Sequence, residues 1–161
     1  VQNMKVWQDL PMFGWKVRDA WNFSAEDSSP PEEKQRWINV NAFVATLVDQ
    51  FSDKTNNSPD LSLFAIWTIR DALEEENVSD PAVAAASVWF MYAASALLQF
   101  SKDQKSFEGK VAKGGFAHQD AGWTGYSPAR WQVWQQRLDN IRGEVKEDGT
   151  KRLVQAAIDA I

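Results

Sequence analysis

The sequence lacks cysteine and contains a single histidine, His118. Without cysteine the chain cannot form disulfides, use a thiol nucleophile, hold an iron–sulfur cluster or ligate zinc through sulfur. With one imidazole it cannot build a metal site that needs two histidines from one chain. Glycine motifs for phosphates or dinucleotides and a serine nucleophile elbow are also missing. We therefore expect no metal and no cofactor.

Positive charge is in deficit as well. Lys and Arg number 17 against 22 Asp and Glu, which gives a net charge of −5. The protein as a whole repels a phosphate backbone, so we expect no nucleic-acid partner. No cationic leader precedes a short apolar stretch, as a secretory signal would require. The absence of cysteine and the acidic charge favour the cytoplasm.

Strand-type alternation of apolar and polar residues is absent, and helix signals take its place. Proline directly after a capping residue marks four helix starts, at Ser29-Pro30, Ser58-Pro59, Asp80-Pro81 and Ser127-Pro128. Shorter helices are expected near residues 11–21 and 150–161. A chain of 161 residues, 44% of them hydrophobic, is expected to form one domain over residues 1–161. The sequence predicts an all-α fold, a single helical domain of five to seven helices around a buried central helix.

Residues 81–100 have the length of a membrane span and few polar residues. Seven alanines make this stretch only weakly hydrophobic by the measure of membrane insertion. Its apolar residues surround the helix axis, which is typical of a helix buried on all sides. We therefore expect it to be the central core helix and not a membrane span.

Tryptophan is in excess, with nine copies. Indoles at helical spacing, such as Trp131 and Trp134, predict core packing. So much indole also supplies the flat apolar walls that small-molecule pockets use. Trp67 is a candidate for such a wall.

The helix expected over residues 58–76 carries charges on its apolar face. A rotation of 100° per residue places Trp67, Arg70 and Glu74 in one row. Charges that face a core must be paired or face a polar cavity. We therefore expect Arg70 and Glu74 to be mostly buried and bonded to each other, to Asn41, to a tryptophan N–H or to backbone. Two interpretations remain open: a pair that fixes helix packing, or a ligand-facing pair in which Arg70 holds an oxygen and Glu74 orients it.

A glycine-containing segment, residues 114–126, gathers further functional groups. It contains an acid/base group, a carboxylate and two aromatic surfaces, from His118, Asp120, Trp123 and Tyr126. Long irregular loops in compact domains are often functional. One hypothesis makes this segment the cover of a pocket that touches Arg70 or Trp67, with its histidine or carboxylate pointing inward. The alternative is a histidine with only a surface or capping role.

Four segments resemble one protein family. They are WKVRDAWN (15–22), WINVNAF (37–43), IRDALE (69–74) and GWTGYSPARW (122–131). Together they are similar to a set of filamentous-fungal proteins grouped as a domain of unknown function, DUF3632. The resemblance implies a fungal, mostly helical, single-domain protein, and it brings no established activity or catalytic residues.

The preferred hypothesis is a small-molecule-binding helical protein. It extends to a cofactor-independent isomerase, cyclase or dehydratase acting on an apolar or aromatic fungal metabolite, as in secondary metabolism. Its catalytic candidates are His118, Asp120, Arg70 and Glu74. Its ligand-binding candidates are Trp67, Trp123, Tyr126, Tyr92 and Asn41. The alternative is a non-enzymatic interaction module or homodimeric scaffold that uses exposed tryptophans.

Overall fold

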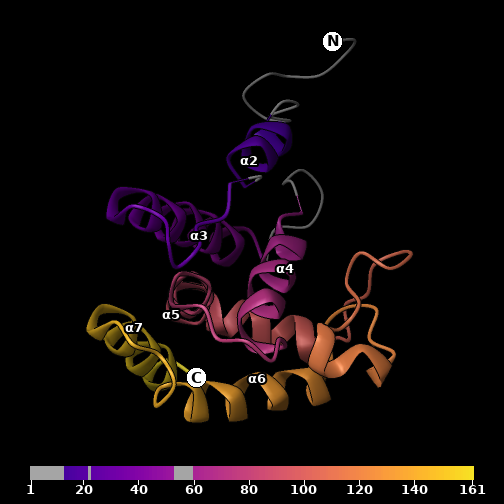
Figure 1. Cartoon of the computed structure of the whole chain (residues 1–161). Coiled ribbons are helices and arrows are strands. Elements are labelled where there is room, and N and C mark those ends of the chain that lie inside the picture. The colour runs from indigo at the N-terminus through magenta and orange to yellow at the C-terminus, as the bar shows by residue number, and fades with distance from the viewer. Residues whose placement is uncertain (1–12, 22, 53–59) are drawn as a thin grey trace.

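The computed structural model describes residues 13–21, 23–52 and 60–161, and the side chains of residues 13–15 lie outside the description. These residues form six α-helices and one 3-10 helix, with no strand among them (Figure 1). In chain order the helices are α2 (Phe13–Trp21), α3 (Pro31–Phe51), α4 (Ser62–Leu73), α5 (Asp80–Lys102), η1 (Phe116–Ala121), α6 (Pro128–Ile141) and α7 (Asp148–Asp159). The predicted all-α fold of five to seven helices is confirmed. The helix start predicted at Ser58-Pro59 lies outside the described residues.

Helix α5 is the central helix, as predicted. It packs against α3, α4, α6 and α7, and Figure 1 shows α3 on one side of it with α6 and α7 on the other. It is long and apolar enough to cross a membrane, but most of its apolar stretch is buried inside the protein. Small side chains allow this burial, because Ala84, Ala85 and Ala86 let neighbouring helices approach closely.

The tryptophans of α6 form the core stripe that their spacing predicts. Trp131 and Trp134 are buried, as are Leu138 and Ile141 one and two turns later. Phe90 of α5 contacts both indoles, with ring centroids 5.8 and 6.3 Å away. Helix α6 begins at a cap, in which Ser127 accepts a hydrogen bond from the Arg130 backbone N–H. The position of this first turn determines which residues of α6 face α5.

Candidate functional site

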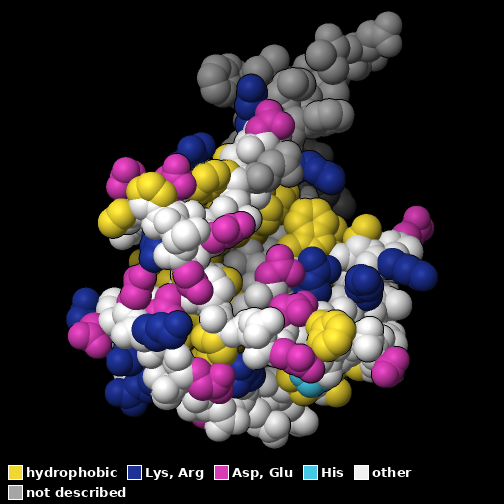
Figure 2. All heavy atoms as spheres, in the orientation of Figure 1, with side chains coloured by type: hydrophobic (Ala, Val, Ile, Leu, Met, Phe, Trp, Pro, Cys, Tyr) yellow, Lys and Arg dark blue, Asp and Glu magenta, His cyan; other side chains and the backbone are white. Residues whose placement is uncertain are grey.

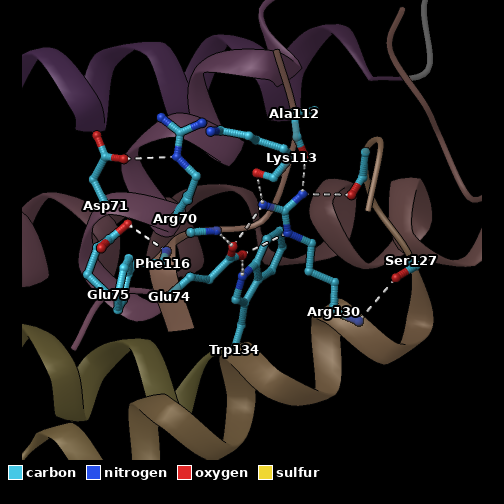
Figure 3. A network of polar contacts seen from close by, with 12 residues as sticks. Arg70, Asp71, Glu74, Glu75, Ala112, Lys113, Phe116, Ser127, Arg130 and Trp134 are labelled. Atoms are coloured by element: carbon cyan, nitrogen blue, oxygen red, sulfur yellow. Dashed lines mark hydrogen bonds and ion pairs between the residues drawn. The ribbon is translucent and has the colours of Figure 1, made fainter. Parts of the chain in front are cut away.

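The carboxylate of Glu74 lies at the centre of a hydrogen-bond network at the end of α4 (Figure 3). Its side chain is fully buried. Its Oε1 accepts hydrogen bonds from Arg130 Nε at 2.7 Å and from Trp134 Nε1 at 2.6 Å. Its Oε2 accepts from Arg130 Nη2 at 3.0 Å and from the Gly115 backbone N–H at 2.8 Å. One carboxylate therefore joins the end of α4 to α6 and to the glycine-containing segment.

Arg130 is equally well satisfied. Its Nη1 donates to the carbonyls of Ala112 at 2.7 Å and Gly125 at 2.9 Å. Its guanidinium carbon lies 5.0 Å from the Trp123 ring centroid and 5.4 Å from that of Trp134, so both indoles contact the cation. In the described part of the chain, every buried side-chain nitrogen and oxygen has a hydrogen-bond partner. This pair leaves no donor or acceptor for a ligand, and we interpret it as structural.

Arg70 and Glu74 do not bond to each other, which was one of the alternatives expected for the two charges. Glu74 lies just past the last residue of α4, with φ −112° and ψ 11°, so its side chain leaves the helical row on which the prediction was based. Arg70 instead donates from Nε to Asp71 Oδ1 at 3.0 Å, and its side chain is 22% exposed. The burial of Glu74 and its bonds to a tryptophan N–H and to backbone are as expected.

Sequence reasoning missed Arg130. The signal that could have found it is the same one that singled out Glu74, because Arg130 lies four residues before Trp134 and shares its apolar row.

Arg70→Ala should therefore have little effect on stability. An isolated pair that is partly open to solvent contributes about 0–1 kcal/mol, far less than a buried one. We expect urea denaturation to show a loss of unfolding free energy within about 1 kcal/mol. A loss above about 2 kcal/mol would mean that Arg70 has a buried structural role.

Asn41 forms hydrogen bonds to three residues in the core. Its Nδ2 donates to the Trp37 carbonyl at 3.0 Å. Its Oδ1 accepts from Thr68 Oγ1 at 2.9 Å and from Trp89 Nε1 at 2.8 Å. The amide therefore links α3, α4 and α5, and its side chain is completely buried in the core.

Tyr126 is also part of the core. It is buried, and its hydroxyl donates to the Ser62 carbonyl at 2.6 Å. Burial raises the pKa of this phenol well above its ordinary value. With its hydroxyl bonded inside the protein, Tyr126 is not placed to close over a ligand.

The glycine-containing segment packs against the end of α4. The Ala117 N–H donates to the Glu74 carbonyl at 3.0 Å. A Cβ at Gly115 would lie 2.6 Å from that same oxygen, so only glycine fits this close approach. The ring of His118 lies 5.2 Å from that of Trp123, and Asp120 is exposed.

A pocket of about 270 Å³ lies where α2, α3, α4 and α5 meet. We call it the tryptophan pocket, lined by Trp21, Ser24, Ala25, Trp37, Trp67, Thr68, Arg70, Asp71 and Ala82. The Trp21 and Trp37 rings meet edge to face at 5.1 Å. Trp67 is held by a hydrogen bond from Nε1 to the Val111 carbonyl at 2.8 Å. Three indoles and one ion pair thus face the same space.

A second pocket of about 310 Å³ adjoins the first. We call it the polar pocket, lined by Arg70, Asp71, Glu75, Lys113, Gly114, Gly115, Phe116 and Gln119. Arg70 and Asp71 line both pockets, so their ion pair stands at the boundary. On the face of the molecule drawn in Figure 2, acidic and basic side chains lie beside a hydrophobic surface.

The structure brings together few of the candidate residues. Trp67 and Arg70 share the tryptophan pocket, whereas His118 and Asp120 line neither pocket. The glycine-containing segment does border a pocket that touches Arg70, since four of its residues line the polar pocket, but His118 and Asp120 are not among them. Tyr92 is 48% exposed and lines neither pocket.

The protein environment raises the pKa of Asp71 above its ordinary value. Desolvation is the main cause, and the neighbouring carboxylates of Glu75 and Glu74 add to it. The attraction of Arg70 opposes the shift without cancelling it. The Asp71 side chain is 62% exposed, so its candidacy rests on its position at the boundary of the two pockets.

A family model described as "Protein of unknown function (DUF3632)" matches residues 1–138. The chain belongs to this family. No curated protein and no solved structure matches the chain. The DUF3632 region contains all the residues that line the tryptophan and polar pockets, and it also contains the Glu74–Arg130–Trp134 network. Helix α7 lies beyond it.

Proposed function

We propose that this protein binds a small apolar or aromatic molecule in the tryptophan pocket. The observation that carries the proposal is the convergence of Trp21, Trp37 and Trp67, from three different helices, on a space bordered by Arg70 and Asp71. Small-molecule sites combine apolar aromatic walls with a few polar groups that fix orientation.

The size of the pocket restricts the ligand. Its volume of about 270 Å³ exceeds the roughly 150 Å³ cavity that accepts benzene, and it lies just below the usual range for drug-sized ligands. A molecule of one or two rings suits this space.

An isomerase, cyclase or dehydratase reaction would use different residues from those the sequence favours. Arg70 keeps its proposed role of binding an oxygen of the ligand, because it lines the pocket. Glu74 is bonded to Arg130 and cannot orient Arg70. The proton carrier would be Asp71, which lines the pocket as His118 and Asp120 do not.

The alternative of an interaction module rested on exposed tryptophans. The tryptophans whose side chains the structure describes (Trp21, Trp37, Trp67, Trp89, Trp123, Trp131 and Trp134) are all buried or half-buried. The alternative, and with it a homodimeric scaffold, therefore has less support than pocket binding. The proposal also includes a cytoplasmic location, which the lack of cysteine and the acidic charge support. It includes a fungal origin, which the resemblance of four segments supports.

The test is ligand-induced thermal stabilisation with indole as the probe. A ligand at one hundred times its Kd stabilises the native state by about 2.7 kcal/mol, which raises the midpoint by roughly 5–10 °C for a chain of this size. Ala82→Phe places a ring in the pocket and should abolish the shift. The matched control is Ala129→Phe on the exposed surface of α6, which should leave the shift intact. Equal shifts in both variants would place the binding elsewhere.

A further inference from the structure

Some charged atoms of Arg70 and Asp71 have no hydrogen-bond partner among the described residues, and they lie at the boundary of the two pockets. Only Arg70 Nε and Asp71 Oδ1 take part in the bond between them. Figure 3 shows the terminal nitrogens of Arg70 and the second oxygen of Asp71 on the same side of the pair. Neither these nitrogens nor that oxygen bonds to any described residue. Hydrogen-bond donors and an acceptor of opposite charge therefore stand side by side.

Lys113 adds a second cation on the polar-pocket side of this boundary. Figure 3 shows its side chain extended toward the Arg70 guanidinium. Both residues line the polar pocket, and the Lys113 amino group forms no ion pair with the described residues. Two like charges that approach one another are stabilised when an anion joins them.

Negative charge balances these cations. Asp71 and Glu75 line the same pocket, and Glu75 Oε1 accepts from the Phe116 N–H at 3.1 Å. The four charged side chains, Arg70, Lys113, Asp71 and Glu75, sum to zero. A ligand with only a carboxylate would meet the Asp71 oxygen, and a ligand with only an ammonium would meet the Arg70 and Lys113 cations. Each would carry an unfavourable contact along with the favourable one.

Resting on the proposed function, we infer that the ligand is a small aromatic molecule with a zwitterionic head, of the aromatic amino-acid class. Its ring occupies the tryptophan pocket, its carboxylate contacts Arg70 and Lys113, and its ammonium contacts the free oxygen of Asp71. Both charges of the head then have partners, and the ring reaches Trp67 on the same helix as the ion pair. The ammonium also offsets the repulsion that Asp71 experiences from Glu75 and Glu74.

Isothermal titration calorimetry with four probes tests the inference. The probes are L-phenylalanine, 3-phenylpropionate, which lacks the ammonium, phenethylamine, which lacks the carboxylate, and indole, which lacks both. We expect phenylalanine to bind at least tenfold more tightly than each of the other three. Binding of 3-phenylpropionate or phenethylamine as tight as that of phenylalanine would overturn the inference.

Two variants separate the charges of the head. Arg70→Gln should weaken phenylalanine and 3-phenylpropionate at least tenfold, and it should tighten phenethylamine because it removes a cation that repels the ammonium. Asp71→Asn should weaken phenylalanine and phenethylamine, and it should tighten 3-phenylpropionate because it removes a carboxylate that repels the ligand's own. Arg137→Gln, at another surface ion pair, is the matched control and should change none of them.

The outcomes also separate the inference from the proposed function. If indole binds as tightly as phenylalanine, the pocket recognises only the ring, so the inference fails and the proposed function stands. If none of the four probes binds, both fail.

Discussion

Glu74→Ala should lower the free energy of unfolding by about 3–5 kcal/mol, because it leaves the Arg130 guanidinium buried without its counter-ion. The other partners of Arg130 are carbonyl oxygens, which accept hydrogen bonds but carry no net negative charge. The Gly115 and Trp134 N–H groups lose their acceptor in the same variant. Urea denaturation followed by circular dichroism measures the loss.

The control is Glu144→Ala, which breaks the exposed pair with Arg137 and should cost within about 1 kcal/mol. A second variant, Glu74→Ala with Arg130→Met, removes both charges and should recover part of the loss. A Glu74→Ala protein as stable as the Glu144→Ala protein would refute the structural role of the network.

Trp134→Ala should cost about 3–5 kcal/mol as the truncation of a completely buried indole. It opens a cavity against Phe90 and Tyr126, whose rings both contact the indole. It also removes one of the donors to Glu74. Both losses act on the native state, and the midpoint of urea denaturation should fall accordingly.

Trp123→Ala is the comparison for this variant. Trp123 is half-buried and covers the Arg130 guanidinium, so its loss should cost only about 1–2 kcal/mol. Because Trp123 lines neither pocket, the variant should bind indole as the wild type does. A large loss of binding in Trp123→Ala would mean that Trp123 covers the ligand.

The helices were predictable because their signals are local. Proline after a capping residue marks the starts of α5 and α6, and the ring of apolar residues on α5 predicts its central place. The burial of Glu74 was predicted by assigning it to the row of Trp67 and Arg70, and the structure does bury it, although its side chain leaves that row. Its partner was not predictable, because α4 ends at Leu73 and the next residue can turn toward another helix.

The tryptophan pocket was not predictable for a related reason. Trp21, Trp37 and Trp67 each belong to the apolar face of a separate helix, and only the packing of α2, α3 and α4 brings them together. Of the residues that line the pocket, sequence reasoning found Trp67 and Arg70, and it passed over Asp71 because it follows Arg70 on a different face of the helix.

Indole N–H resonances in a two-dimensional ¹H–¹⁵N spectrum test the proposed binding site most directly, since nine tryptophans provide reporters throughout the protein. Upon titration with L-phenylalanine or indole, the proposed site predicts that the signals of Trp21, Trp37 and Trp67 shift together with one Kd. The signals of Trp131 and Trp134, which lie in the core of α6 outside the pocket, should stay in place. Saturable shifts at Trp131 and Trp134 with none at Trp21, Trp37 and Trp67, or no shift at any indole, would contradict it.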